Sequence, residues 1–252
     1  MNKNTPFITA ILAAGQGKRM NSAIPKVLHE LNKKPLIGHV IENAQALNPD
    51  RIIAILGYGR LQVINYIKDY HIEYAIQEQQ LGTAHAVQQI ERLLDNKEGN
   101  LLVLSGDVPL LRTTTLKKLL TKHVNTDSSA TILTAIFDDP SGYGRIIRNA
   151  DHTFDSIIEH KDCTSDQQQI NEINAGVYIF KIQPLFKALK AIDNNNVQGE
   201  YYLPDVLGYF IKSGKTVAIQ IIADPIEISG VNTTEQLSDI SSIYMERYAK
   251  TN

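Results

Sequence analysis

Short apolar runs alternate with amphipathic stretches along most of the chain. The apolar runs predict strands at residues 8–13, 51–56, 73–76, 101–104, 130–137 and 177–180. Apolar positions that recur on one helical face predict helices at residues 36–47, 60–69, 83–94, 116–124 and 233–248. Strands that alternate with helices indicate βαβ units and a mostly parallel sheet.

Two polar stretches, residues 138–149 and 163–172, interrupt this alternation, and the strands around them resemble hairpins. We therefore predict an α/β fold, a doubly wound core with an added substrate-facing part at about residues 138–225. The last predicted helix begins at Thr233 or Thr234, either of which is a suitable N-cap.

The composition narrows the class of protein. The chain has 252 residues, of which 43% are apolar and 21% charged, an ordinary balance for a soluble protein. A formal net charge of −2 argues against a nucleic-acid partner, because such proteins usually carry a basic excess. No apolar run is long enough to span a bilayer, and the N-terminal residues lack a signal-peptide core. We expect a cytoplasmic, globular protein without nucleic-acid or membrane partners, and its single cysteine, Cys163, excludes a disulfide framework.

The first predicted strand runs into a glycine-rich loop, with the sequence AAGQGKR at residues 13–19. The loop is not a dinucleotide fingerprint, because Met20 stands where the third glycine is required. It is not a P-loop either, because Arg19 and Leu12 stand where that motif requires Ser or Thr and an upstream glycine.

The loop nevertheless has the general properties of a phosphate-binding loop. Ala13, Ala14 and Gly15 carry little or no side chain, so a ligand can approach their backbone closely. A loop after the first strand lies where open α/β sheets bind ligands, and Arg19 and Lys26 add charge for a polyphosphate. The other interpretation is an ordinary strand-to-helix turn with solvated cations, and these residues alone leave both open.

A series of motifs follows this loop in order. L-A-A-G-x-G-x-R-M (12–20) and P-K-V-L-H (25–29) resemble the signature of sugar-1-phosphate nucleotidyltransferases. They are followed by QEQQLGTAHA (77–86), LSGDVPLL (104–111), GYGRI (142–146), IIEHKD (157–162), NEINAGVY (171–178), GEYYLPD (199–205) and GVN (230–232). Over residues 12–232, the ordered set is similar to the N-terminal half of the bacterial bifunctional N-acetylglucosamine-1-phosphate uridyltransferases.

The resemblance implies a Rossmann-like nucleotidyltransferase fold with a nucleotide over the glycine loop. Residues 1–137 would form the nucleotide-binding part of a single domain, residues 138–225 its β-rich sugar-binding part, and residues 226–252 a metal-ligand loop and C-terminal helix. The implied nucleotide-binding residues are Leu12, Ala13, Ala14, Gly15, Lys26, Gln77, Gly82, Thr83, Ser105, Gly106 and Asp107. The implied sugar-binding residues are Gly144, Glu159, Asn174, Glu200, Tyr202 and Asn232.

The resemblance also implies a reaction, transfer of UMP from UTP to N-acetylglucosamine-1-phosphate with Mg²⁺ as cofactor. Arg19, Lys26 and Asp107 would be catalytic, and Asp107 and Asn232 would hold the Mg²⁺. Elementary chemistry agrees, because the attacking phosphate is already a nucleophile and needs no catalytic Ser, Cys or His. Fixed cations and a metal ion offset repulsion between the anions and charge on the departing pyrophosphate. Oxygen ligands suit Mg²⁺, which fills its other positions with phosphates and water.

Several of these residues also have an ordinary structural interpretation. Asp107 can form a turn before the following proline, although its place after an apolar strand favours the metal role. Glu159 alone would more often be a solvated strand residue, and Asn174 a turn residue. Gly82 and Thr83 can simply start a helix, whose backbone amides can equally face a ligand. The seven histidines show no zinc-site spacing, so we assign them no catalytic role.

The sequence departs from the family pattern at Lys18, where Thr is usual, and at Ser105, where Tyr is frequent. The chain ends soon after its last predicted helix, so we expect no acetyltransferase β-helix domain and few of the family's trimer contacts. The oligomeric state therefore stays open, as does the choice between a monofunctional enzyme and a domain of a longer one. Glucosamine-1-phosphate or another sugar-1-phosphate, GTP in place of UTP, and a catalytically silent UDP-sugar-binding domain remain alternatives.

Overall fold

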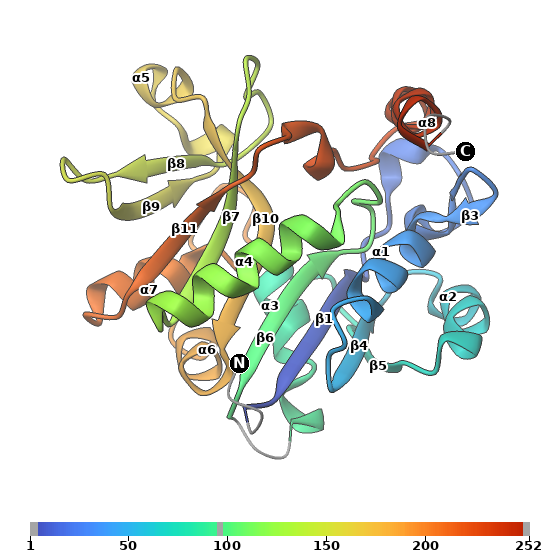
Figure 1. The fold of residues 1–252 in the computed structure, drawn as a ribbon, viewed down its shortest axis with the longest axis horizontal. Coiled ribbons are helices and arrows are strands. Elements are labelled where there is room, and N and C mark those ends of the chain that lie inside the picture. Colours follow the sequence, from blue (N-terminus) through green and yellow to red (C-terminus); the bar gives the residue numbers. More distant parts are fainter. Residues whose placement is uncertain (1–4, 95–97, 249–252) are drawn as a thin grey trace.

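The computed structural model describes residues 5–94 and 98–248 as an α/β fold (Figure 1). Its strands are β1 Phe7–Ala13, β2 Glu30–Leu31, β3 Lys34–Pro35, β4 Arg51–Leu56, β5 Glu73–Ile76, β6 Asn100–Ser105, β7 Ala130–Ile136, β8 Arg145–Arg148, β9 Phe154–Ile158, β10 Glu172–Lys181 and β11 Val217–Ile221. Its α-helices are α1 Leu36–Gln45, α2 Arg60–Ile67, α3 Thr83–Gln88, α4 Thr113–Thr126, α5 Ser165–Gln168, α6 Ile182–Leu189, α7 Asp205–Lys212 and α8 Thr234–Tyr248. Short 3₁₀ turns lie at Lys18–Met20, Lys26–Leu28, Lys68–Tyr70, Glu91–Leu93, His160–Asp162 and Pro225–Ile228.

A mixed sheet of nine strands organises the described residues, in the order β11-β7-β10-β6-β1-β4-β5 with the β8–β9 hairpin attached to β10. Strands β6, β1, β4 and β5 run parallel, as do β11 and β7, whereas β10 runs antiparallel to both β6 and β7. Leu12 pairs with Ser105 of β6 and Ile55 of β4, so these three carboxyl ends are level. Because β10 is antiparallel, its first residues lie at the edge where its neighbours end.

Helices cover both faces of the sheet because its central strands are apolar on both faces. On one face, α1, α2 and α4 pack on side chains that include Ile11 and Leu104. On the other face, α3, α6 and α7 pack on side chains that include Ala10 and Val103. Neighbouring residues of one strand thus point into opposite layers, as the pleat requires. Figure 1 shows α4 in front of the sheet.

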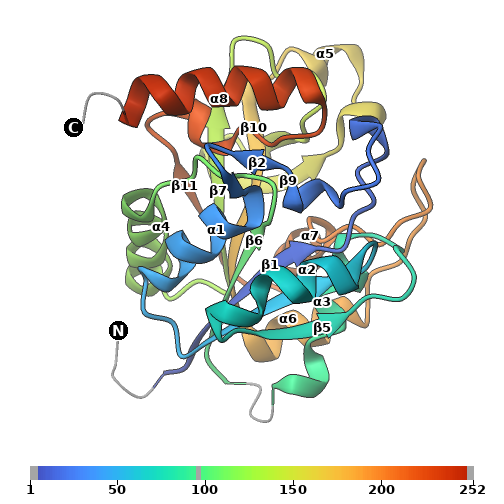
Figure 2. The same ribbon diagram turned by 90° about the vertical axis from the view of Figure 1, so that its right-hand side faces the viewer.

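Helix α8 lies across the end of the molecule that carries β2 (Figure 2). Its Ile240 packs with Met20 of the glycine-loop segment and Val231 of the preceding segment. Thr233 Oγ1 accepts a hydrogen bond from Gln236 N (3.2 Å), so Thr233 caps the helix, one of the two caps predicted. No described helix, α8 included, is both long and apolar enough to cross a membrane.

The predicted α/β fold class is confirmed, and each predicted strand and helix occurs, the strands at 51–56 and 73–76 with the predicted ends and the others with shifted ends. The strand predicted at residues 177–180 is the longer β10, and the helix predicted at residues 83–94 is interrupted after Gln88. Strands β2, β3 and β11 and helices α5, α6 and α7 were missed. Strand β11 is a half-buried edge strand, and Pro184 occupies the first turn of α6, where proline is tolerated although it suggests a break in sequence. The division into three functional parts stays a prediction.

A histidine buried under α4 makes stability depend on pH. His123 Nε2 donates to Asn100 Oδ1 (3.0 Å) and Nδ1 accepts from Thr131 Oγ1 (2.8 Å), so the neutral ring is satisfied. Burial, with Lys181 nearby, lowers the pKa of His123 from 6.5 to about 4. Because the unfolded chain binds this proton more readily, its contribution to stability is complete above pH 6.5 and is lost as the pH falls towards about 4.

We therefore expect His123 to lower the free energy of unfolding by about 2 kcal/mol between pH 8 and pH 5, measured by urea titration. The non-titrating variant His123→Gln should show a correspondingly smaller loss over the same range. Equal pH dependence in the two proteins would contradict this assignment.

Candidate active site

The segments that follow the parallel strands meet at one edge of the sheet, where such folds bind ligands. The glycine loop follows β1, Gln77 follows β5 and Asp107 follows β6. Asn174 lies near the start of antiparallel β10, which brings it to the same edge. Asn232 reaches this edge from the segment between β11 and α8.

The glycine loop folds back over Lys26. Gly17 has a φ of 63° and begins the 3₁₀ turn Lys18–Met20. A Cβ atom built at Gly17 would lie 2.6 Å from Lys26 Cβ. Glycine combines this left-handed backbone with so close an approach, whereas a side chain would be strained on both counts. A Cβ built at Gly15 would meet no atom within 4 Å, so the space beside that backbone is open.

Backbone hydrogen bonds hold Asp107 next to this loop. Gly106 N donates to Leu12 O (2.9 Å), and a Cβ at Gly106 would lie 3.1 Å from that oxygen. Val231 N donates to Asp107 O (3.0 Å). The segment after β6 is therefore tied to β1 on one side and to the segment that carries Asn232 on the other.

Lys26, Asp107 and Asn232 meet through their side chains. The Lys26 ammonium donates to Asp107 Oδ2 and, at 3.0 Å, to Asn232 Oδ1. Both oxygens therefore point at one position that already holds a cation. The side chains of Lys26 and Asp107 are each 16% exposed, so this position is accessible from one side.

This pair of oxygens fits a divalent metal ion of the hard, oxygen-binding kind. A carboxylate oxygen and an amide oxygen that converge on an ammonium can converge in the same way on a metal. Within residues 5–94 and 98–248, no three His, Cys, Asp or Glu side chains gather as a metal site. A metal held by Asp107 and Asn232 would therefore take its other ligands from a bound substrate and from water.

The glycine-loop cavity, of about 710 Å³, opens on one side of Asp107. It is lined by every residue predicted to bind the nucleotide except Gly106, namely Leu12, Ala13, Ala14, Gly15, Lys26, Gln77, Gly82, Thr83, Ser105 and Asp107. Gln16, Lys18 and Gln80 also line it. The structure thus brings these residues together, and their individual roles stay predictions.

The Asn174 cavity, of about 380 Å³, opens on the other side of Asp107 and is also lined by Gly144, Glu159, Asn174 and Asn232. Asn174 N donates to Gly144 O (2.8 Å), and a Cβ at Gly144 would lie 3.1 Å from Glu159 Oε1. Asp107 lines both cavities, so it stands at their junction.

Glu159, which lines the Asn174 cavity, and Asp205, whose charge acts on Glu159, have raised pKa values. Burial raises the pKa of Glu159, and the neighbouring charges of Asp205 and Asp162 add to this. Burial likewise raises the pKa of Asp205 to about 6, with contributions from Asp193 and Asp162. A carboxyl group that keeps its proton more readily can donate as well as accept, which suits a ligand rich in hydroxyl groups.

Some residues lie on a different side of the site from that expected. Arg19, expected at the triphosphate, lines the Asn174 cavity, whereas the adjacent Lys18 lines the glycine-loop cavity. Glu200, expected at the sugar, lines the glycine-loop cavity. Tyr202 is in the lining of neither cavity, and its hydroxyl accepts a hydrogen bond from Gln198 Nε2 (2.5 Å).

The start of α3 is packed against another part of the chain. Gly82 has a φ of 111°, and a Cβ there would collide with the backbone of Tyr201. Ala84 N donates to Tyr201 O (2.9 Å), and Leu203 N donates to Thr83 Oγ1 (3.0 Å). The amide of Ala84 is therefore engaged by the chain itself and is not open to a ligand.

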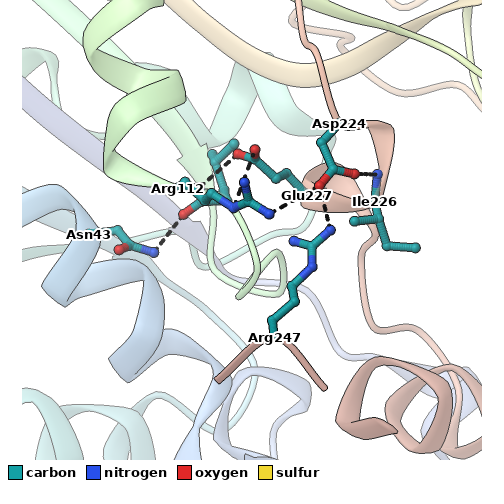
Figure 3. Close-up of polar contacts among 7 residues, drawn as sticks. Asn43, Arg112, Asp224, Ile226, Glu227 and Arg247 are labelled. Atoms are coloured by element: carbon teal, nitrogen blue, oxygen red, sulfur yellow. Dashed lines mark hydrogen bonds and ion pairs between the residues drawn. The ribbon is translucent and has the colours of Figure 1, made fainter. Parts of the chain in front are cut away.

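The Arg112 network, made of Arg112, Asp224, Glu227 and Arg247, fixes the segment that leads to Asn232 (Figure 3). Glu227 is 3% exposed, accepts a hydrogen bond from Arg112 N (2.9 Å) and lies 3.6 Å from Arg112 Nε. Asp224 binds the guanidinium groups of Arg112 (3.1 Å) and of Arg247 from α8 (2.6 Å). The network therefore joins the segment after β6, the segment before Asn232 and α8.

The chain matches the Nucleotidyl transferase family model over residues 8–224. It belongs to the nucleotidyltransferase family, the class of enzyme that fits a Rossmann-like fold with its site at this edge of the sheet. Nucleotidyltransferases of this family generally use a divalent metal ion.

The particular relatives are bifunctional proteins named GlmU. That of Halalkalibacterium halodurans is 44% identical over 237 residues, which cover 94% of this chain and 52% of that protein. That of Pediococcus pentosaceus is 44% identical over 247 residues, or 98% of this chain and 52% of that protein. The chain thus spans about half the length of these curated relatives. A UDP-glucose pyrophosphorylase solved with UDP-glucose shares the fold with a TM-score of 0.77 at 18% identity, over 96% of this chain and 99% of that one.

Removal of the Glu227 carboxylate should destabilise the protein. In Glu227→Ala the Arg112 N–H loses its acceptor, and we expect the free energy of unfolding, from urea titration, to fall by about 2 kcal/mol. Glu42→Ala is the matched control, because Glu42 pairs with Lys34 at an exposed position and should cost less than about 1 kcal/mol. Similar losses in the two variants would mean that the Arg112 network has no special structural role.

Proposed function

We propose that the chain transfers UMP from UTP to N-acetylglucosamine-1-phosphate, with Mg²⁺ as cofactor, and releases UDP-N-acetylglucosamine and pyrophosphate. The observation that carries this proposal is the convergence of Lys26, Asp107 and Asn232 at the junction of two cavities. UTP would occupy the glycine-loop cavity and the sugar phosphate the Asn174 cavity. The GlmU relatives at 44% identity support the choice of the N-acetylglucosamine pair.

The chemistry requires charge and position rather than a protein nucleophile. An anionic oxygen of the sugar phosphate attacks the α-phosphorus of UTP, and a new P–O bond forms as the bond to the pyrophosphate oxygen breaks. Pyrophosphate leaves with that electron pair, so no proton transfer is needed. Arg19 would bind the incoming phosphate from the Asn174 cavity, while Lys18 and Lys26 would bind the triphosphate.

The metal ion would be held by Asp107 and Asn232. When bound there, Mg²⁺ supplies positive charge for the α-phosphate and the leaving group. Asp107 and Asn232 would then be engaged by the metal, which leaves the Lys26 ammonium to donate to a phosphate oxygen. The same lysine therefore satisfies Asp107 before substrate binds and stabilises developing charge afterwards.

Two other functions use the same site. The reaction can take another sugar-1-phosphate or another nucleotide, since the phosphate groups of any such pair would meet Arg19 in one cavity and Lys18 and Lys26 in the other. A catalytically silent UDP-sugar-binding domain is the alternative favoured by the departures at Lys18 and Ser105, both of which line the glycine-loop cavity. Under all of these functions, a cytoplasmic protein that acts on small molecules stays our prediction, and the oligomeric state stays open.

The deciding experiment measures pyrophosphate release in the presence of Mg²⁺. UTP, GTP, CTP and dTTP are each combined with N-acetylglucosamine-, glucosamine- and glucose-1-phosphate. We expect fast release only with UTP and the acetylated sugar, and the Asp107→Asn variant should be slower by roughly 10²–10³-fold. Asp69→Asn, at an exposed position, is the matched control and should be fully active.

Each other outcome changes one part of the proposal. Fast release with a different pair would retain the mechanism and replace the substrates. Binding of UDP-sugar without pyrophosphate release from any pair would identify a binding domain. Full activity in Asp107→Asn would contradict the metal assignment.

Lys18 should strengthen nucleotide binding, because it lines the cavity in which the triphosphate would lie. In Lys18→Thr, which restores the usual family residue, we expect the KM for UTP to rise about fivefold and kcat to change little. Steady-state kinetics at low ionic strength measure this split, with Lys117→Thr on α4 as the control. An unchanged KM would mean that Lys18 is only a solvated surface cation.

A further inference from the structure

Gln77 is held by contacts that fix the orientation of its amide. The residue is 3% exposed and lines the glycine-loop cavity. Gln77 Nε2 donates to Gly82 O at 3.0 Å and lies 3.0 Å from His85 Nδ1. The nitrogen, rather than the oxygen, must face Gly82, because two carbonyl oxygens at that distance have no hydrogen to share.

His85 accepts the second N–H of this amide. A buried amide nitrogen needs partners for both of its hydrogens. Gln89 Nε2 also lies near this ring, 3.2 Å from His85 Nε2. It does not need the ring as an acceptor, because it donates one hydrogen to His85 O (2.8 Å) and, being half-buried, can donate the other to water. The His85 ring therefore accepts at Nδ1 and carries its hydrogen on Nε2.

The carbonyl oxygen of the Gln77 side chain is what remains for a ligand. Both hydrogens of Gln77 Nε2 are engaged, and within the described part of the chain no donor reaches Gln77 Oε1. The backbone of Gln77 is fixed as well, because its N–H donates to Leu56 O (2.7 Å). The cavity wall thus presents a fixed hydrogen-bond acceptor.

We propose that His85 is the positioning residue for base selection, since together with Gly82 O it engages both hydrogens of Gln77 Nε2, holds the amide oxygen towards the base and so makes the site accept the N3–H of uracil. This inference rests on the proposed function, in which the base lies in the glycine-loop cavity. Cytosine has a bare acceptor at N3 and would face Gln77 Oε1 with no hydrogen between the two atoms. A fixed acceptor discriminates against cytosine, whereas an amide that is free to turn over can donate to it.

The test compares three proteins that differ in the acceptor at position 85. His85→Leu removes the acceptor at similar volume, and His85→Asn carries an amide oxygen that can take the place of Nδ1. For each protein, kcat/KM is measured with UTP and with CTP at the same sugar phosphate, together with the calorimetric Kd of UDP and of CDP. Thermal unfolding checks that each variant is folded, and His85→Met, which also lacks a nitrogen acceptor, replaces the leucine variant if that one does not fold.

We expect the unmodified protein to prefer uridine nucleotides by about 10²-fold or more, because a site with a fixed acceptor rejects a base that cannot donate. His85→Leu should lose roughly tenfold or more of this preference, and His85→Asn should keep it within about threefold. Gln89→Leu removes the neighbouring amide but not the contact between Gln77 and His85, so it should keep the preference too.

The outcomes separate this inference from the proposed function. An unchanged ratio of uridine to cytidine in folded His85→Leu, with UTP turnover intact, would overturn the role of His85 alone. Absence of pyrophosphate release from UTP in the unmodified protein would overturn the proposed function instead. In that case the ratio of the Kd values for UDP and CDP, compared between the unmodified protein and His85→Leu, would still support or overturn the role of His85.

Discussion

The contact of Lys26 with Asp107 and Asn232 is the interaction on which the rest of the site depends. It requires three segments that are distant in sequence to place one ammonium between two oxygens. Backbone hydrogen bonds from Gly106 and Val231 fix the neighbouring segments independently of these side chains. A partly buried carboxylate without a partner is costly, so Lys26 also keeps Asp107 satisfied when no phosphate is present. The cation thus stabilises the geometry that a metal and a triphosphate would later use.

The direction of β10 explains why there are two cavities rather than one. A purely parallel sheet would offer only the loops after its strands at this edge. Because β10 is antiparallel to β6 and β7, its first residues and the attached β8–β9 hairpin reach the same edge. Asn174 and Glu159 thereby form a second wall, and Asp107 lies between that wall and the glycine loop. The two anionic substrates proposed above would then approach one position from opposite sides.

The sequence predicts those parts of the molecule that local signals determine. Apolar runs identify the central strands, and an aspartate directly after such a run identifies Asp107. The contact between Lys26 and Asn232 spans 206 positions and was not predicted, since the family resemblance implied only that Asn232 binds the sugar and holds a metal together with Asp107. The sequence also does not show that Lys18 and Arg19 line different cavities. Successive side chains of a 3₁₀ turn point about 120° apart, but the rest of the fold decides what each of them faces. Edge strand β11 has the apolar sequence VAIQI, so the local pattern is typical of a strand there although none was predicted.

The net charge of −2 and the anionic ligands proposed here are compatible because local rather than total charge selects a small ligand. Some cations of the described chain are neutralised in pairs, such as Arg148 with Glu172 and Lys34 with Glu42. Lys18 and Arg19 are in no ion pair with a described residue, and each lines one of the two cavities. A phosphate that binds such an unpaired cation does not first have to displace a carboxylate from it. Lys18 and Arg19 therefore supply positive charge from both sides of the position where two phosphate groups would have to approach each other.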